Sequence, residues 1–308
     1  MDATSRRIVI GDIHGCEKAL RTVLRAIGPQ PQDHFVFLGD YIDRGPDSKG
    51  VVDLILKLRQ RSRVTALRGN HEIMLLGVRA GMNDDVWVRC GGVATVASYG
   101  GSLAKLPEQH LRFFRSLQFY LETPDAIFVH AGYDPDVDMA DQSEHKMFWE
   151  HLDTSNPPSP HHSGKRVFVG HTPQPRGRIW QSDHLVCLDT YCFGGGYLTA
   201  YETGTDEIWQ ASREGHLRRS LRRGFSNWRQ QVWDRFSGLV SSPAEEQTPN
   251  NGTTTGPEIT ATENSPEVVV AEPSNPPAVS VGASAQNQPA QNLPESEKPA
   301  PIRPASGK

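Results

Sequence analysis

Five short apolar runs, each followed by a polar segment that contains a glycine, constrain the fold of this chain more than any other feature. The runs cover residues 8–10, 35–38, 64–67, 126–129 and 167–169. β-Branched and aromatic residues dominate these runs, which is typical of buried strands. Near 17–27 and 48–61, between the first three runs, apolar residues recur at three- and four-residue steps, as in amphipathic helices. This alternation predicts the α/β class.

Two later apolar runs change the expected architecture. Residues 184–189 and 196–201 stand close together, without a helical segment between them. Such spacing favours added antiparallel strands, because parallel neighbours need a longer crossover. We therefore expect a mixed or two-sheet core that is covered by helices.

The polar segments after the five runs carry residue types that bind metal ions. In order, they read GDIHG from Gly11, GDYIDRG from Gly39, RGNHE from Arg68, HAG from His130 and GHT from Gly170. Ligands commonly bind where the carboxyl ends of neighbouring strands meet. We therefore expect the aspartates, the asparagine and the histidines to gather at one place. The glycines would let the backbone turn sharply beside them.

The chemistry of this set indicates which ions it would hold. A single histidine is more often an ordinary core or surface residue, but five such motifs together are not explained in that way. Carboxylate, amide oxygen and imidazole suit manganese, iron or zinc, whereas a magnesium or calcium site would rarely use so many imidazoles. The side chains outnumber the ligands that one ion needs. The sequence therefore predicts two divalent metal ions, with manganese favoured and iron or zinc as alternatives.

These motifs, in this order and spacing, resemble the phosphoprotein phosphatase (PPP) branch of the calcineurin-like metallophosphoesterase superfamily. The segment DRGPDSKG from Asp43 and the sequence Leu188-Asp189-Thr190 before a glycine-rich stretch resemble the bacterial serine/threonine protein phosphatases of that branch. The resemblance covers about residues 6–205. It implies the calcineurin-like fold, a two-sheet β-sandwich flanked by helices, and a hydrolase activity on phosphate monoesters.

The resemblance also implies roles for individual residues. The implied metal ligands are Asp12 and His14 for the first ion, Asp40 as the bridge between the ions, and Asn70, His130 and His171 for the second ion. His71 would be the general acid, and Asp43 would orient it. Arg44 and Arg68 would hold the phosphate oxygens, which a guanidinium can do with two hydrogen bonds at once.

The expected reaction is an in-line displacement at phosphorus. Two neighbouring ions lower the pKa of a shared water, and the metal-bridging hydroxide would attack directly, without a covalent phosphoenzyme. A charged histidine would protonate the leaving alkoxide, and a carboxylate would keep that imidazole charged and aimed. Asp47 has no role in this scheme and is interpreted as a turn or helix-cap residue together with Ser48.

The chain departs from the bacterial pattern in three places. His151 stands where relatives often carry a phosphate-binding arginine, so phosphate binding would be weaker or depend on pH, unless Arg166 takes that place. The insertion at 156–162 is predicted to be a loop whose two histidines are exposed to solvent. Tyr191 follows the LDT sequence and either reaches the phosphate or, as we favour, packs against its neighbours.

Two further regions are predicted after a catalytic domain at 1–212. Residues 213–240 contain seven arginines and an apolar stripe at helical spacing, which predicts a basic amphipathic helix. That helix would pack on the body, or bind a membrane surface or a protein partner, while nucleic acid is disfavoured. Residues 241–308 contain no aromatic residue and 12 of the 23 prolines, so we expect a disordered, acidic, proline-rich tail.

Composition limits the expected compartment. The chain has 308 residues, of which 36% are hydrophobic, and no apolar run long enough to span a membrane. Its start lacks the pattern of a signal peptide, and its four cysteines form no CxxC pair, which indicates reduced thiols. We therefore expect a cytoplasmic protein, held peripherally at the inner membrane face if the basic helix binds lipid.

The sequence leaves three functions open. The leading one is a serine/threonine protein phosphatase that acts on a phosphoprotein or a small phosphorylated substrate. A symmetrical dinucleoside-tetraphosphate hydrolase would use the same metal site, so only substrate tests separate the two. A catalytically silent phosphate- or membrane-binding scaffold is the alternative of another class. It would require a missing ligand or acid, and none is missing.

Overall fold

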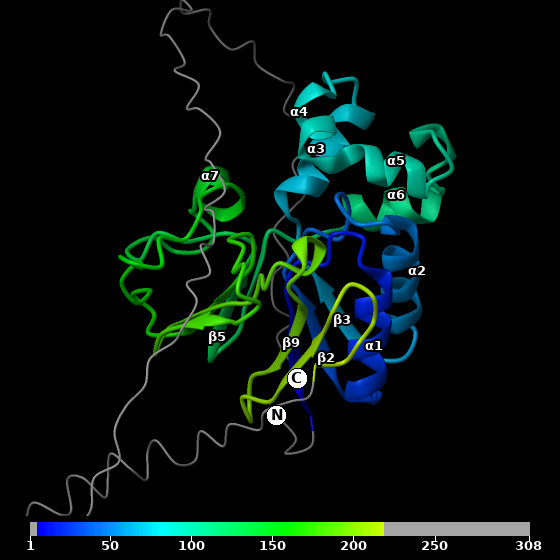
Figure 1. Ribbon diagram of the computed structural model, residues 1–308. Helices are drawn as coiled ribbons and strands as arrows, with labels where there is room; N and C mark the ends of the chain where they lie inside the picture. Colours follow the sequence, from blue (N-terminus) through cyan, green and yellow to red (C-terminus); the bar gives the residue numbers. More distant parts are fainter. Residues whose placement is uncertain (1–4, 219–308) are drawn as a thin grey trace, which may run out of the picture. The chain divides into compact units, whose positions relative to one another are not determined.

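The computed structural model describes residues 5–218, which form two five-stranded sheets with helices on their outer sides (Figure 1). The first sheet has the strand order β10-β9-β1-β2-β3, and the second has the order β4-β5-β6-β8-β7. The strands are β1 Arg7–Ile10, β2 His34–Phe37, β3 Arg63–Ala66, β4 Tyr120–Glu122, β5 Ala126–Val129, β6 Arg166–Val169, β7 Trp180–Gln181, β8 Leu185–Cys187, β9 Leu198–Glu202 and β10 Ile208–Ala211. This is the predicted two-sheet sandwich flanked by helices.

Local sequence signals explain where the two long helices beside the first sheet begin and end. α1 (Glu17–Ile27) ends at Gly28, whose left-handed backbone stops the helix. α2 (Ser48–Leu58) begins after Asp47, whose carboxylate accepts a hydrogen bond from the Gly50 amide, so the predicted helix cap is confirmed. The remaining helical segments are α3 Asn70–Arg79, α4 Asp85–Trp87, η1 Val88–Gly92, α5 Val93–Ser98, η2 Leu103–Lys105, α6 Glu108–Arg115, α7 Glu144–Phe148 and η3 Cys192–Gly194.

Parallel pairing aligns the ends of the strands that carry the polar segments. β1 pairs in parallel with β2, and β2 with β3, so that Ile10 lies beside Phe37 and Phe37 beside Ala66. In the second sheet β5, β6 and β8 are likewise parallel. Parallel strands end on the same side, so the loops that follow them gather at one edge of each sheet.

The core divides at the first sheet. Val9 and Val36 face the second sheet and pack with Phe128 and Phe168. Ile8, one position earlier, belongs to the cluster between the first sheet and helices α1 and α2. Successive strand residues point to opposite faces, which explains why these strands read as continuous apolar runs with both faces buried.

The five predicted strands and the two predicted helices are confirmed, but the two later runs lie in different sheets. The run at 196–201 overlaps β9, which pairs antiparallel with β1 as expected. The run at 184–189 contains β8, which pairs in parallel with β6 and antiparallel only with β7. The chain crosses from one sheet to the other between the two runs, which their spacing does not reveal.

Most of the C-terminal region lies outside the described residues. This applies to the predicted tail at 241–308 and to residues 219–240 of the predicted helix. Residues 213–218, predicted to start the helix, instead form a turn in which Leu217 pairs with Ala211 and the Arg218 amide donates to the Gln210 carbonyl (2.8 Å). Of the helices in residues 5–218, none is long and apolar enough to cross a membrane.

Buried His34 in β2 makes the stability of the first sheet depend on pH. Its Nε2 lies 2.9 Å from the Thr65 hydroxyl. Burial, followed by the nearby charges of Arg63 and Arg7, lowers the pKa of His34 to about 4. The unfolded chain therefore binds this proton more readily than the folded one. The free energy of unfolding is therefore not reduced by His34 above the ordinary pKa of histidine. It falls as the pH drops from that value towards the pKa of His34 in the folded chain.

A His34→Gln variant, which retains a polar contact to Thr65, should lose less unfolding free energy than the wild type between pH 6.5 and pH 4. We expect a difference of about 1–2 kcal/mol over this range. Urea unfolding of both proteins at several pH values measures it. An equal pH dependence of the unfolding free energy in the two proteins would contradict the prediction.

Candidate active site

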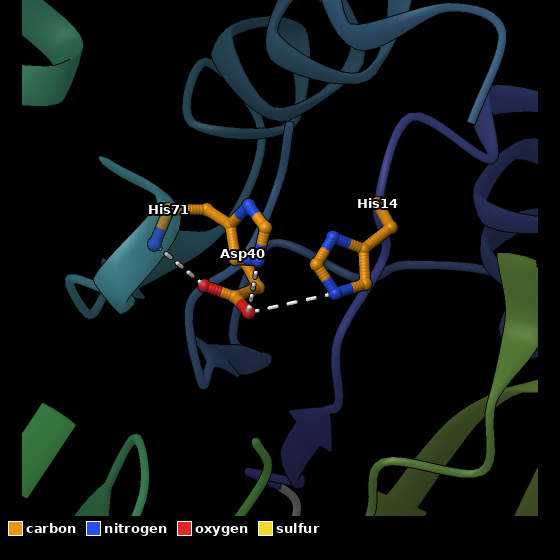
Figure 2. Close-up of side chains that lie close together, drawn as sticks. All are labelled: His14, Asp40 and His71. Carbon is orange, nitrogen blue, oxygen red and sulfur yellow. Dashed lines mark hydrogen bonds and ion pairs between the residues drawn. The ribbon is translucent and has the colours of Figure 1, made fainter. Parts of the chain in front are cut away.

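Asp40 is the centre of the candidate site. It is buried, follows β2 in the left-handed backbone region (φ 51) and belongs to two groups of side chains whose ligand atoms lie within 4.8 Å of one another. The groups are His14, Asp40 and His71, and Asp40, His130 and His171. In Figure 2, dashed lines join the Asp40 carboxylate to His14 and His71.

Loops from both sheets supply the predicted metal ligands. Asp12 and His14 follow β1, Asp40 follows β2, Asn70 begins α3 after β3, His130 follows β5 and His171 follows β6. The sequence interpretation relied on strand ends lying side by side in one sheet. The structure instead brings together strand ends from two sheets that face each other across the core.

Backbone carbonyl groups orient the three imidazoles around Asp40. A carbonyl oxygen only accepts hydrogen bonds, so the ring nitrogen that faces it carries the proton and the other nitrogen keeps its lone pair. The pairs are His14 Nδ1 with Ile42 (2.9 Å), His130 Nδ1 with Leu38 (2.9 Å) and His171 Nε2 with Trp149 (3.2 Å). Burial lowers the pKa of all three rings, which keeps them neutral and able to bind a metal ion.

The unprotonated ring nitrogens lie close to other acceptors, which is typical of a cation site, although His14 Nε2 also accepts a hydrogen bond from Arg44 Nη1 (2.9 Å). His130 Nε2 lies 3.1 Å from Asn70 Oδ1 and 3.5 Å from an Asp40 oxygen. His14 Nε2 lies 3.5 Å from the other Asp40 oxygen. Acceptors this close repel one another unless a positive charge lies among them. The residues therefore fit two divalent cations that share Asp40, and the mixture of imidazole, amide and carboxylate suits a first-row transition metal or zinc.

Asp12 joins the site at its edge, next to a carboxylate that the sequence interpretation did not assign to the site. Both oxygens of Asp12 lie within hydrogen-bonding distance of the His171 amide (3.2 and 3.0 Å). Asp189 accepts from the Tyr191 amide (3.0 Å), and its other oxygen has no hydrogen-bond partner within residues 5–218. Burial raises the pKa of Asp189 to about 7, and burial followed by Asp189 raises that of Asp12. A signal was present, because Asp189 follows β8 as Asp12 follows β1.

The predicted acid and its orienting carboxylate are in direct contact. His71 Nδ1 donates to Asp43 Oδ2 (2.6 Å), and the same carboxylate accepts from Trp87 Nε1 (2.8 Å) and the Thr95 hydroxyl (2.6 Å). The His71 Nε2 atom is buried, has no hydrogen-bond partner in the described chain and lies 3.9 Å from Asp40. Burial would lower the pKa of His71, but Asp40 and Asp43 outweigh it and raise the pKa. A proton is therefore available on the side of the ring that faces Asp40.

Glu72, in the motif RGNHE, is a further buried residue that the sequence interpretation left without a role. Its carboxylate accepts hydrogen bonds from the backbone amides of Asp40 (3.0 Å), Tyr41 (2.9 Å) and Gly69 (3.0 Å). It therefore ties the loop after β2 to the loop after β3. Burial, together with the charge of Asp40, raises the pKa of Glu72 to about 8.

The two predicted phosphate-binding arginines differ in position. Arg44 Nη1 donates to His14 Nε2 (2.9 Å), so the guanidinium of this exposed residue lies beside the candidate metal ligands. The Arg68 guanidinium lies over the ring of Phe119, at 5.0 Å from the centroid, and donates to the Arg115 carbonyl (3.4 Å). The structure thus brings Arg44 to the metal ligands and holds Arg68 on the neighbouring surface.

His151 lies beside the second group of ligands, whereas Arg166 cannot replace it. The exposed His151 ring stacks on His171 with ring centroids 4.5 Å apart. Arg166 pairs with Asp206 (3.0 Å) and donates to the Tyr201 hydroxyl (2.9 Å). Arg166 is the first residue of β6, while the polar segment follows the last residue of that strand, so the substitution suggested from sequence is wrong.

The histidines of the insertion differ from each other. His161 is buried, with its Nε2 3.0 Å from the Val137 carbonyl, so the expectation of solvent exposure is wrong for this residue. His162 is exposed, as expected, and pairs with Asp138 (3.0 Å). Neither belongs to the candidate metal groups found among residues 5–218. The Tyr191 ring contacts Phe193 edge to face (4.8 Å), which agrees with the packing that the sequence interpretation favoured.

Backbone strain is concentrated at this site. The non-glycine residues with positive φ include His14, Asp40, Asp43, Arg44 and His171. Such conformations are costly and persist where the surrounding structure enforces them, which is common at functional sites. Glycines provide the space for the close approach: a Cβ atom on Gly170 would lie 2.0 Å from Asp12 Oδ1.

A Gly170→Ala variant should therefore displace Asp12 and lower both metal content and phosphatase activity, the activity by about 10²-fold or more. Elemental analysis after gel filtration and a p-nitrophenyl phosphate assay measure the two effects. Gly204→Ala is the matched control, because its nearest neighbour is only the flexible end of Glu202 (3.1 Å). Full metal content in Gly170→Ala would show that metal binding does not require Asp12 to lie against Gly170.

A two-sheet sandwich with a shared carboxylate, converging imidazoles and a His–Asp pair at the strand ends defines a metallophosphoesterase. Residues 5–200 match the family model described as calcineurin-like phosphoesterase, and the chain belongs to this family.

Several known proteins are similar to this chain. A serine/threonine-protein phosphatase 1 of Salmonella typhimurium is 32% identical over 197 residues, which are 62% of this chain and 88% of that protein. The asymmetrical bis(5'-nucleosyl)-tetraphosphatase PrpE of Oceanobacillus iheyensis is 29% identical over 235 residues, 67% of this chain and 92% of that protein. The crystal structure of a putative diadenosine tetraphosphatase has the same fold, with a TM-score of 0.53, 24% identity, and coverage of 68% of this chain and 94% of that one. The chain is thus a phosphatase-family hydrolase related to enzymes with two kinds of substrate.

Proposed function

We propose that this protein is a serine/threonine protein phosphatase that depends on two metal ions. The observation that carries the proposal is the position of Asp40 between the neutral imidazole of His14 and those of His130 and His171, next to a His71 ring that can donate a proton. The similarity to a bacterial serine/threonine-protein phosphatase supports the choice of substrate.

The side chains divide the work of the reaction. When bound, two divalent cations at Asp40 supply Lewis-acid stabilisation of the phosphoryl group and lower the pKa of a water molecule. Arg44, whose guanidinium lies beside His14, holds phosphate oxygens with charge-assisted hydrogen bonds. His71 donates the proton at Nε2 to the leaving serine or threonine oxygen, while Asp43 holds Nδ1–H and stabilises the charged ring.

The cofactor and the location belong to the same proposal. Manganese is the favoured metal, with iron or zinc as alternatives, because imidazoles and carboxylates share the site. The four free cysteines support a reducing compartment, which favours the cytoplasm. Binding of residues 213–240 to a membrane or a protein partner stays a prediction.

Dinucleoside tetraphosphate hydrolysis is the second candidate. The relative that favours it is named as an asymmetrical tetraphosphatase, so this candidate takes the asymmetrical form rather than the symmetrical one that the sequence suggested. Both reactions would use the same ligands and the same proton donor.

Comparing kcat/KM for a phosphothreonine peptide and for diadenosine tetraphosphate, both with manganese-loaded protein, tests the proposal. A large preference for the peptide supports a protein phosphatase. A preference for the dinucleotide overturns it, and the products then separate asymmetrical cleavage (ATP and AMP) from symmetrical cleavage (two ADP). A protein that binds manganese but turns over neither substrate would be the silent scaffold.

A further inference from the structure

Phe193 lies at the point where the first sheet meets the candidate site. It belongs to η3, the short turn between Tyr191 (φ 63) and Gly195 (φ 101) that precedes β9. The ring is partly buried against the core cluster of the first sheet. The guanidinium carbon of Arg44 lies over this ring, 4.6 Å from its centroid.

The Phe193 ring is itself fixed from several sides. Its edge-to-face contacts are with His14 (4.9 Å) and Tyr191 (4.8 Å). Its backbone carbonyl accepts a hydrogen bond from Arg213 Nη1 (3.1 Å). A ring held by two neighbouring rings and by a backbone hydrogen bond offers a fixed face to Arg44.

Arg44 is held without being neutralised. Its own backbone is left-handed (φ 65), its amide donates to the Gly91 carbonyl (3.2 Å) and its Nε donates to the Cys90 carbonyl (3.4 Å). Among residues 5–218, Arg44 makes no ion pair with a carboxylate, although other arginines of the chain do. A carboxylate would compete with phosphate for the N–H groups. An aromatic face fixes the plane of the guanidinium without occupying the N–H groups that the Cys90 carbonyl and His14 leave open.

We propose that Phe193 is a positioning residue that holds the Arg44 guanidinium in the orientation needed to bind the substrate phosphate. The inference rests on the proposed phosphatase function. Phe193 acts through Arg44, and its contact with His14 is tested separately by the metal content of the variants.

Two substitutions at Phe193 distinguish the contribution of the aromatic ring from that of an apolar side chain of similar size. Phe193→Leu retains an apolar side chain but removes the ring, and we expect it to lower kcat/KM for p-nitrophenyl phosphate about 3- to 30-fold. The inhibition constant for inorganic phosphate should rise by a similar factor, because the product uses the same arginine. Phe193→Tyr keeps the aromatic face and should restore both values to within about twofold of the wild type.

A double-mutant cycle with Arg44→Ala shows whether Phe193 acts through Arg44. In the Arg44→Ala background, Phe193→Leu should change kcat/KM by less than about twofold. An additive effect, equal in both backgrounds, would mean that Phe193 has a merely structural role and would overturn the inference. Loss of bound manganese in Phe193→Leu would overturn it as well, since the effect would then pass through His14.

Tyr197→Leu is the matched control. Tyr197 lies on the same glycine-rich segment and carries Arg218 over its ring at the same 4.6 Å, but this arginine does not contact the metal ligands. Its removal should leave the phosphate inhibition constant unchanged, whereas an equal rise would overturn the special role of Phe193. A wild type without phosphatase activity would refute the proposed function and this inference with it. An active wild type with an additive cycle would refute the inference alone.

Discussion

Replacing Asp40 with asparagine will abolish turnover and lower the metal content of the protein. Asp40 is the one side chain common to both groups of ligands, and its two oxygens lie 3.5 Å from His14 Nε2 and from His130 Nε2. An amide has no charge to offset the repulsion between two cations, and it offers only one oxygen. Since metal ions at such sites contribute several kcal/mol to the stabilisation of the transition state, we expect kcat to fall at least about 10³-fold.

Elemental analysis and p-nitrophenyl phosphate hydrolysis measure the two consequences of Asp40→Asn. Asp47→Asn provides the control from the same loop, since Asp47 caps α2 and asparagine caps a helix as well as aspartate does. The control should keep its activity and its metal. An Asp40→Asn protein that retains two metal ions and turns over substrate would contradict the bridging role.

Replacing His71 with asparagine should slow the reaction by an amount that depends on the leaving group. His71 Nε2 is buried without a hydrogen-bond partner in residues 5–218, and Asp43 holds the opposite nitrogen at 2.6 Å. A serine or threonine alkoxide must be protonated as it leaves, whereas p-nitrophenolate is stable as an anion. We expect kcat to fall about 10²- to 10⁴-fold with a phosphothreonine peptide and far less with p-nitrophenyl phosphate.

Rates on both substrates, measured for His71→Asn and for Asp43→Asn, test this assignment. If the two residues work as a unit, the double variant should be little slower than His71→Asn alone. Equal losses on both substrates would instead indicate that His71 binds phosphate or a metal ion and does not act as the acid. The assignment of His71 as the acid also requires that His71→Asn keeps its full metal content.

The sequence predicted the strands and the gathering of polar side chains at their ends because both rest on local signals. A run such as 35–38, buried on both faces, has a strand composition whatever lies around it, and the glycine after it marks the turn. The contact between His71 and Asp43 agrees with the expectation from the resemblance. The resemblance supplied the individual roles, which neither spacing nor composition could supply.

The features that the sequence did not predict depend on how the two sheets face each other. Asp189 follows β8 as Asp12 follows β1, but β8 and β1 belong to different sheets, so this signal alone did not place the two carboxylates together. His161 was expected in solvent because of its proline-rich loop, yet that loop folds back on Val137. Arg166 looked available until the structure showed its pairing with Asp206 at the far end of β6.

The origin of the ligands in both halves of the sandwich has a consequence for folding. Asp12, His14, Asp40 and Asn70 follow strands of one sheet, while His130 and His171 follow strands of the other. A metal ion that binds only when these loops meet links the two sheets, and its binding free energy adds to the free energy of folding. Removal of the metal ions by a chelator would then lower both the activity and the stability of the fold. A cell short of the metal would hold less folded enzyme as well as less active enzyme.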